Sequence, residues 1–279
     1  MKKWILIIDV EKCEDCNNCF LACKDEHCGN DWPGYAVSQP LHGHRWMNIL
    51  RKERGTFPQI DIAYLPKPCL HCDDAPCIRE AEGAIYRRDD GIVMIDPEKA
   101  KGRKDLRRAC PHGAIWWNDE AKVAQKCTFC AHLLDDGWKA PRCVQACPTG
   151  ALSAHQVEME ELEAFIRQHQ LETLASAGGD RRYGVYYRNL YRFESCFIAG
   201  SVAVRKGDTA DCAADLTVVL IKDGEVVAKT ATDVFGDFKF DGLPEKSGEY
   251  RLEIRLDEKP ALTRAVQVDQ SHSVGTLWL

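Results

Sequence analysis

The sequence has no long hydrophobic run, no excess of positive charge and no recognisable export signal. Its first apolar stretch, Trp4 to Ile8, is too short for the core of a signal peptide and is followed at once by Asp9. No run approaches the roughly 20 apolar residues that a membrane-spanning helix needs. The net charge of −6 at pH 7 gives no reason to expect nucleic acid as a partner. We therefore expect a cytoplasmic protein without direct membrane contact.

The one strong excess is cysteine. The 279 residues suffice for two domains, and the 45% hydrophobic and 29% charged residues are typical of a globular protein. Thirteen of the fifteen cysteines fall before residue 148. Such a concentration indicates either disulfides or metal ligands, and disulfides are rare in the cytoplasm, where thiols stay reduced. We therefore expect the first half of the chain to bind metal.

The cysteines form four runs with the spacing of bacterial ferredoxins. The first run is CEDCNNCFLAC, the second is CLHCDDAPC, the third is a single Cys-Pro pair, and the fourth joins CTFC to CVQACP. Their cysteines are, in order, Cys13, Cys16, Cys19 and Cys23; Cys69, Cys72 and Cys77; Cys110; and Cys127, Cys130, Cys143 and Cys147. In paired ferredoxin runs, the last cysteine of each run binds the cluster held by the other run.

Two of the runs are incomplete in a complementary way. The second run has Ala81 where its last cysteine should stand, and the third has Ala100, Arg103 and Leu106 in place of its first three. If these two runs are partners, the loss of one cluster explains both gaps, and Cys110 is kept for the cluster of the second run. Pairing the first run with the fourth, and the second with the third, is the arrangement that uses all twelve ligands.

This pairing predicts three 4Fe–4S clusters. Their ligands are Cys13, Cys16, Cys19 and Cys147 for the first; Cys69, Cys72, Cys77 and Cys110 for the second; and Cys127, Cys130, Cys143 and Cys23 for the third. Tetrahedral zinc is the less favoured alternative, because CxxCxxCxxxC followed by repeated Cys-Pro pairs is not typical of zinc sites. Cys28, Cys196 and Cys212 fit no run, and we interpret them as plain thiols.

Other polar residues lie close to the cysteine runs. The sequence around the lost cluster is basic, with Lys101, Arg103, Lys104, Arg107 and Arg108. A solvated surface is the ordinary interpretation, and a docking patch for an acidic electron carrier is the alternative. His71 and His112 stand beside ligand cysteines, and we expect them to tune a cluster by hydrogen bonding, or to pack, rather than to bind iron.

The rest of the chain changes from helical to strand periodicity. Residues 155–177 have the apolar spacing of an amphipathic helix that stops at Gly178 and Gly179. The aromatic and basic residues 183–194 are interpreted as a connector. A strand is expected from Trp4 to Val10. Further strands are expected at 197–204, 215–222, 225–231, 237–241, 249–257, 261–268 and 275–279.

These patterns predict an α+β protein of three parts. Residues 1–154 form a ferredoxin-like domain with three clusters, residues 155–196 a helix and connector, and residues 197–279 a small all-β sandwich. Asp223-Gly224 indicates a tight hairpin inside the sandwich. The sandwich sequence contains no Ser/His/Asp grouping and no phosphate-binding glycine loop, so we expect it to dock or stabilise rather than to catalyse.

The twelve-cysteine half resembles the iron–sulfur subunits of the dimethyl-sulfoxide-reductase family of molybdenum enzymes. The β half, with TDVFGDFKFDGLPEKSGEYRLEI, is similar to transthyretin-like, carboxypeptidase-regulatory domains. Over the whole chain, the sequence resembles the small-subunit family of pyrogallol–phloroglucinol transhydroxylases. The stretches that carry this resemblance are CEDCNNCF, WPGY, GHRWMNI, DGIVMIDPEKAKG, QKCTFCAHLLDD and YYRNLYRFE.

The resemblance implies an electron-transfer subunit without an active site of its own. A large catalytic partner, in a heterodimer or higher assembly, would hold a molybdenum bis-pterin cofactor and act on polyhydroxylated aromatic rings in the cytoplasm. An aromatic hydroxylase or dehydroxylase, or a membrane-attached respiratory molybdenum reductase, is the alternative assignment. A scaffold whose clusters serve only folding is the third possibility.

Overall fold

The computed structural model describes residues 1–174 and 182–279, which form two compact units. The first unit contains Met1–Leu50 and Tyr64–Leu190, and the second contains Arg51–Ala63 and Tyr191–Leu279. This division differs from the boundaries expected at residues 154 and 196, because the segment 51–63 belongs to the second unit. No helix among the described residues is long and apolar enough to cross a lipid bilayer.

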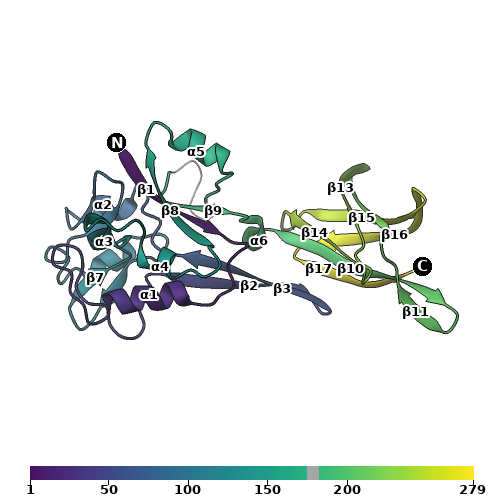
Figure 1. Ribbon diagram of the computed structural model, residues 1–279, viewed down its shortest axis with the longest axis horizontal. Helices are drawn as coiled ribbons and strands as arrows, with labels where there is room; N and C mark the ends of the chain where they lie inside the picture. Colours follow the sequence, from purple (N-terminus) through teal and green to yellow (C-terminus); the bar gives the residue numbers. More distant parts are fainter. Residues whose placement is uncertain (175–181) are drawn as a thin grey trace. The chain divides into compact units, whose positions relative to one another are not determined.

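The first unit consists mainly of short elements separated by loops (Figure 1). They are β1 (Lys2–Asp9), α1 (Asn18–His27), α2 (Pro76–Glu80), β4 (Ile85–Arg87), β5 (Val93–Ile95), the 3-10 helix η1 (Lys104–Arg108), β6 (Trp116–Asn118), β7 (Val123–Gln125), α3 (Ala131–Asp135), α4 (Arg142–Gln145), β8 (Leu152–Glu158), α5 (Leu162–Gln168) and β9 (Val185–Arg188). β4 pairs with β5, and β6 with β7, as two antiparallel hairpins. The cysteine runs lie on the loops and short helices between these strands.

A three-stranded sheet of order β8-β1-β9 is the longest regular feature of the first unit. The strand expected from Trp4 to Val10 is confirmed as β1, whose residues from Ile5 to Ile8 are at most 3% exposed. β8 runs antiparallel to β1, and β9 runs parallel to it. A continuous apolar run suits this central position, because a central strand covered on both faces has no solvent side.

The helix expected over residues 155–177 is wrong for most of its length. Val157 belongs to strand β8, where it pairs with Lys3, and only Leu162–Gln168 are helical. Apolar residues of β8 and α5 pack into one cluster with Ile5 and Ile7. A strand followed by a short helix therefore presents nearly the same apolar spacing as one long helix, and pairing with β1 decides between them. Residues 175–177, with Gly178 and Gly179, lie outside the described residues.

The connector expected over residues 183–194 is also corrected. Val185–Arg188 form strand β9, in which Val185, Tyr186 and Tyr187 are buried. The short helix α6 (Tyr191–Glu194) follows and begins the second unit. Aromatic and β-branched residues favour strands where one face packs on a core, so the sequence of β9 suits its place beside β1.

The second unit is an all-β sandwich. Its strands are β10 (Cys196–Lys206), β11 (Thr209–Cys212), β12 (Thr217–Lys222), β13 (Glu225–Ala231), β14 (Asp237–Leu243), β15 (Gly248–Leu256), β16 (Lys259–Val268) and β17 (His272–Trp278). In one sheet, β11, β14 and β17 all pair with β10, and the other has the order β13-β12-β15-β16. Ile198 and Phe238 of the first sheet share one buried core with Val218 and Leu252 of the second.

The expected strands of this unit are all present, and β11 is an additional strand that the sequence pattern did not reveal. β11 is exposed along its length, so it has no alternation of apolar and polar residues by which to recognise it. The hairpin at Asp223-Gly224 is confirmed, because both residues have positive φ, at 52° and 86°. This is the conformation that a two-residue type I′ turn requires.

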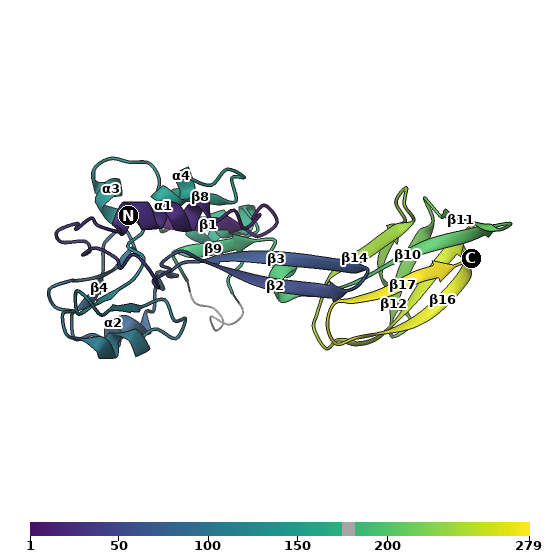
Figure 2. The ribbon, with the colours of Figure 1, turned by 90° about the horizontal axis from the view of Figure 1, so that it is seen from below.

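A long hairpin of β2 (Asn48–Thr56) and β3 (Gln59–Lys67) was also missed from the sequence (Figure 2). Its outer part belongs to the second unit, where Arg54 is 2% exposed and forms ion pairs with Asp61 and Asp241. Gly55 has a φ of +84°, and a Cβ at this position would lie 2.5 Å from Phe197. The close approach of this backbone to the sandwich therefore requires glycine.

Candidate metal centres

The first candidate centre joins the start of α1 to the end of α4. Cys13 and Cys16 lie on the loop after β1, Cys19 lies on the first turn of α1, and Cys147 follows α4. Burial, together with the nearby thiols of Cys13, Cys16 and Cys147, raises the pKa of the Cys19 thiol to about 12. Four thiols close enough to influence one another in this way form the first group.

The second candidate centre draws on the loop after β3, helix α2 and the end of η1. Burial raises the pKa of the Cys72 thiol to about 12, and the thiols of Cys69, Cys110 and Cys77 add to that effect. The pKa values of the Cys77 and Cys110 thiols are likewise raised by burial and by the nearby thiol of Cys69. The isolated Cys110 thus lies beside the three cysteines of the second run.

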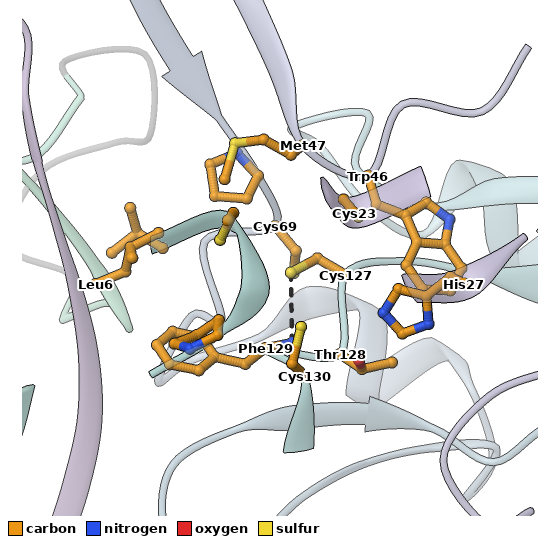
Figure 3. Close-up of a pocket in the computed structure, with 14 residues that line it drawn as sticks. Leu6, Cys23, His27, Trp46, Met47, Cys69, Cys127, Thr128, Phe129 and Cys130 are labelled. Carbon is orange, nitrogen blue, oxygen red and sulfur yellow. Dashed lines mark hydrogen bonds between the residues drawn. The ribbon is translucent and has the colours of Figure 1, made fainter. Parts of the chain in front are cut away.

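The third candidate centre lies around a cavity in the first unit. Burial is the main reason why the pKa of the Cys143 thiol lies well above its usual value. The nearby thiols of Cys130, Cys127 and Cys23 contribute to the same rise. These four cysteines line one apolar cavity together with Cys69 and His27. Figure 3 shows Cys23, Cys127 and Cys130 around this cavity, which Trp46 and Met47 also border.

The third group lies between the other two. The pKa of its Cys143 thiol is also raised by Cys19 of the first group. The pKa of its Cys127 thiol is raised by Cys69 of the second group. The ring of Phe129, between Cys127 and Cys130, lies 5.5 Å from the ring of His71, between Cys69 and Cys72. The three groups therefore follow one another in space in the order first, third, second.

The CxxC loops of the three groups share a backbone feature. In each loop, the residue before the second cysteine is left-handed: φ is 55° at Asp15, 47° at His71 and 57° at Phe129. Gly102 occupies the same place in the run that has lost its first three cysteines, and its φ is 77°. Positive φ is uncommon for residues other than glycine. All four runs therefore share the same left-handed turn, including the run that has no CxxC motif.

Apolar packing replaces the ligands of the lost cluster. Ala81 and Ala100 are 0% exposed and Leu106 is 1% exposed, and all three belong to one buried core cluster. Ile85, Val93, Ile95 and Ile115 are further members of that cluster. At the remaining lost position, Arg103 forms ion pairs with Asp105 and Glu82 at the surface. The same cluster contains Cys77, and Cys72 and Cys110 pack against it, so the apolar side chains at the lost positions lie directly beside the second group.

Several thiols accept hydrogen bonds. The Phe129 backbone N–H donates to the Cys127 sulfur over 3.4 Å (Figure 3), and the Ala114 N–H donates to Cys110 over 3.4 Å. The Gln39 amide donates to the Cys23 sulfur over 3.8 Å. Hydrogen bonds to the charged form of a thiol favour the thiolate, which is the form that binds iron. The donors thus suit sulfur ligands that carry negative charge.

His71 packs against the second and third groups. It is 1% exposed, and its Nδ1 accepts a hydrogen bond from the Val93 backbone N–H over 3.0 Å. Its Nε2 has no partner among the described residues. Because Nδ1 is the acceptor, Nε2 carries the proton of the neutral ring, and a cluster sulfur would satisfy this buried donor. His112 lies with its ring 6.4 Å from that of Tyr183.

His27 also borders the third group, and the sequence reasoning missed it. Burial lowers the pKa of His27 to about 3, with a further contribution from His132. Its Nδ1 is buried without a partner among the described residues. The spacing could have revealed this residue, because His27 stands four positions after Cys23 on α1 and therefore on the same helix face.

The three remaining cysteines lie apart from these groups. The Cys28 sulfur donates to the Pro40 carbonyl over 3.4 Å, Cys196 is buried in the core of the sandwich, and Cys212 is exposed. Within residues 1–174 and 182–279, no three His, Cys, Asp or Glu side chains are arranged around a point that could hold one metal ion. The four thiolates of a 4Fe–4S cluster bind four separate irons and are not expected to meet at one point.

The basic residues of the lost run are partly neutralised by neighbours. Arg103 pairs with two carboxylates, and Lys104 lies 3.8 Å from Asp119. Lys101, Arg107 and Arg108 are exposed. Docking of an acidic carrier at this surface stays a prediction.

The sequence matches known iron–sulfur proteins. Residues 60–157 match the 4Fe-4S dicluster domain family, which supports the expected ferredoxin-like domain. The chain is 46% identical to the pyrogallol hydroxytransferase small subunit of Pelobacter acidigallici, and the match covers 100% of both chains. It is 36% identical to a sulfite dehydrogenase subunit of Allochromatium vinosum, over 60% of this chain and 74% of that one.

A third relative is a subunit of a respiratory enzyme. The chain is 29% identical to the arsenate respiratory reductase iron-sulfur subunit of a Shewanella species, over 62% of this chain and 92% of that one. Among solved structures, the Klebsiella pneumoniae 5-hydroxyisourate hydrolase aligns with a TM-score of 0.24 and 18% identity, over 30% of this chain and 90% of that one. This TM-score is too low to support a conclusion about the fold, so the likeness of the sandwich to transthyretin stays a prediction.

Proposed function

Because the chain belongs to the iron–sulfur subunits of molybdenum oxidoreductases, in the family of the pyrogallol hydroxytransferase small subunit, we propose that it serves a catalytic partner as a relay with three clusters. The observation that carries this proposal is the gathering of twelve thiols into three groups of four. Each group combines three cysteines of one run with one from the partner run, as a pair of ferredoxin runs requires.

The proposed ligands follow these groups. They are Cys13, Cys16, Cys19 and Cys147 for the first cluster; Cys69, Cys72, Cys77 and Cys110 for the second; and Cys23, Cys127, Cys130 and Cys143 for the third. Burial and repulsion from neighbouring thiols make the thiols of Cys19, Cys72 and Cys143, one in each group, costly to ionise in the protein alone. Iron would compensate that cost by binding each thiolate. The unpartnered nitrogens of His27 and His71 also suit a sulfide-containing group at these places.

Iron and sulfide analysis tests the ligand assignment. Three four-iron clusters predict about twelve irons and twelve acid-labile sulfides per chain. A content near eight or near sixteen would contradict the assignment. Because the lost run packs as an apolar core, we expect no fourth cluster even when the chain is reconstituted with excess iron and sulfide.

A bound 4Fe–4S cluster supplies one-electron transfer. The chain contributes burial that excludes water, N–H donors to the sulfurs, and a sequence of three adjacent groups with the third in the middle. The sandwich sequence has no catalytic grouping that would use those electrons. Redox groups without a substrate site need a second site at which chemistry occurs. We therefore assign catalysis to a partner chain.

The partner is a large molybdopterin-binding chain with a molybdenum bis-pterin cofactor, in a heterodimer or higher assembly. This assignment is supported by the full-length match to a small subunit. We place the complex in the cytoplasm, without nucleic acid and without direct membrane contact. Copurification of a large chain that contains molybdenum tests the assignment, and isolation of a stable complex without molybdenum would contradict it.

The proposed substrates are polyhydroxylated aromatic rings. Transfer of a hydroxyl group between two phenols moves no net electrons. Hydroxylation of one ring with water releases electrons at every turnover, and dehydroxylation consumes them. An assay of the purified complex with pyrogallol, with and without an artificial electron carrier, separates these reactions. Turnover without any carrier would support transhydroxylation, and strict dependence on a carrier would support a hydroxylase or dehydroxylase.

A respiratory reductase is the second candidate, because the chain also matches the arsenate respiratory reductase subunit. That match covers 62% of the chain, whereas the pyrogallol hydroxytransferase small subunit matches all of it. The difference favours the phenol-directed enzyme. Inactivity on every phenol, together with reduction of an oxyanion or sulfoxide by the same complex, would overturn the proposal in favour of the respiratory one.

A further inference from the structure

Lys126 differs from the other buried cations of the molecule. Lys3, Arg54 and Lys126 are the basic side chains at 2% exposure among the described residues. Lys3 pairs with Asp73, and Arg54 pairs with two aspartates. The Lys126 ammonium donates hydrogen bonds to two backbone carbonyls, those of Val93 and Cys127, the latter over 2.9 Å. No carboxylate in the described part of the chain forms an ion pair with it.

A buried ammonium without an anion is energetically unfavourable, because carbonyl dipoles replace its hydration only in part. A retained buried charge of this kind therefore indicates a negative charge nearby. The carboxylates do not provide one at Lys126, and the thiolates of the adjacent groups are the other acidic side chains. A 4Fe–4S cluster bound by four cysteine thiolates is negatively charged and gains further negative charge on reduction.

The position of Lys126 connects the second and third groups. Its partner Cys127 is a member of the third group. Its other partner, Val93, donates its backbone N–H to His71, which lies between Cys69 and Cys72 of the second group. The ammonium thus lies where the backbones that support the two groups come together.

The charge of Lys126 lies within electrostatic range of thiols in both groups. These thiols are Cys77 and Cys110 of the second group and Cys127 of the third. One buried cation therefore lies close to both proposed clusters.

We propose that Lys126 is a positioning residue for electron transfer, whose ammonium offsets part of the negative charge of both the second and the third cluster and raises both of their reduction potentials. This inference rests on the proposed cluster assignment. A fixed positive charge favours the reduced form of a cluster, because reduction adds negative charge in a medium of low dielectric constant. Because Lys126 acts on two neighbouring clusters in the same direction, it changes the free-energy difference between them less than a charge beside one cluster alone would.

The test compares Lys126→Met with two other variants in the full-length chain with its clusters, by redox titration followed with electron paramagnetic resonance. We expect Lys126→Met to make reduction of the second and third clusters about tenfold less favourable, a fall of about 59 mV for a one-electron couple, and to leave the first cluster unchanged. Lys126→Arg keeps the charge, so its cluster potentials should be close to those of the unmodified protein. Lys139→Met removes the same charge from an exposed position, where water screens it. This variant should leave the reduction potential of every cluster unchanged.

Iron analysis separates a failure of this inference from a failure of the cluster assignment. If the unmodified chain lacks about twelve irons, the assignment itself is wrong. If Lys126→Met keeps its iron and no reduction potential falls, the role of Lys126 is refuted. It is also refuted if the potential of the first cluster falls as much as those of the other two. If Lys126→Met assembles incompletely, selective loss of the second and third clusters, with full assembly in Lys126→Arg, supports the role. Loss of all three clusters in Lys126→Met, or the same selective loss in Lys126→Arg, overturns it.

Discussion

The two units of this molecule build their interiors from different chemistry. The second unit has eight strands and a continuous apolar core drawn from both sheets. The first unit surrounds three groups of thiols with loops and with helices such as α2 and α4, which have five and four residues. Helices of this length are not stable alone in water. We therefore expect the stability of the first unit to depend on what its thiols bind, and that of the second unit not to.

The same contrast recurs inside the first unit, at the run that has lost three cysteines. Its backbone keeps the left-handed residue of the other runs, at Gly102, but Ala81, Ala100 and Leu106 pack as an apolar core. Apolar side chains thus fill the space that the proposed clusters occupy at the other runs, and the turn is the same. We infer that a cluster bound at such a run would serve both electron transfer and packing, and that apolar side chains replace only the packing.

Removal of iron should have the largest effect and should separate the units. After chelation under oxidising conditions, we expect the first unit to lose its cooperative unfolding transition and the second to keep its own. Six of the seven tryptophans precede residue 139, so fluorescence reports mainly on the first unit, and the strand signal in circular dichroism reports on the second. Equal loss of both signals would show that the two interiors are not independent.

Replacement of Cys110 by Ala should remove one metal centre and spare two. The second group would keep only three thiolates, so the iron content should fall from about twelve to about eight per chain. Cys212→Ala is the matched control, because Cys212 is exposed and lies outside the groups. Loss of the cluster of Cys127 and Cys130 in the Cys110 variant, as seen by electron paramagnetic resonance, would contradict the pairing of the runs.

Arg54→Met should weaken the second unit alone. The Arg54 side chain is 0% exposed, and its removal leaves the carboxylates of Asp61 and Asp241 with Lys239 and Arg192 as their remaining partners. We expect the free energy of unfolding of this unit to fall by about 3 kcal/mol, at an unchanged iron content. Lys239→Met, at a more exposed position, should cost less than about 1 kcal/mol. Equal effects of the two variants in urea unfolding would contradict the role of burial.

Acid should weaken the same ion pairs. Burial alone would raise the pKa of Asp61, but Lys239, Arg192 and Arg54 hold it below its ordinary value of 3.8, and the pKa of Asp241 is lowered for similar reasons. A carboxylate whose pKa is depressed by folding contributes stability that is complete above the unfolded value and is lost as the pH falls through the folded value. The second unit should therefore lose stability below about pH 4. Urea unfolding at pH 5 and pH 3 measures this loss, which Arg54→Met should reduce.

Ala81→Cys should have the smallest effect. It restores one ligand of the lost cluster, but Ala100, Arg103 and Leu106 supply no other thiolate, so the iron content should not rise. Ala81 is 0% exposed, and the added sulfur should cost about 1 kcal/mol through overpacking of the apolar core. An additional cluster in this variant would show that the site is less completely filled than the packing indicates.

The spacing of the cysteines already predicts which of them belong together. A 4Fe–4S cluster needs four thiolates, a short loop provides three, and the gaps at Ala81 and before Cys110 admit one consistent pairing; the structure gathers the thiols with that same membership, while their binding of iron stays a prediction. The sandwich strands were also predictable, because alternation along a half-buried strand is a local property. The exposed strand β11 lacked that alternation and was missed.

Only the tertiary structure decided the remaining features. Val157 and Val185 are strand residues because both β8 and β9 pair with β1, and no local pattern specifies that pairing. Arg54 is buried because the tip of the β2–β3 hairpin belongs to the second unit. Lys126 directly follows β7, and its ammonium donates to the carbonyl of Val93 on β5, 33 residues earlier in the chain. This long-range contact places Lys126 beside both groups of thiols. Spacing along the chain determines which ligands can share a cluster, whereas the charge around that cluster depends on contacts between residues far apart in sequence.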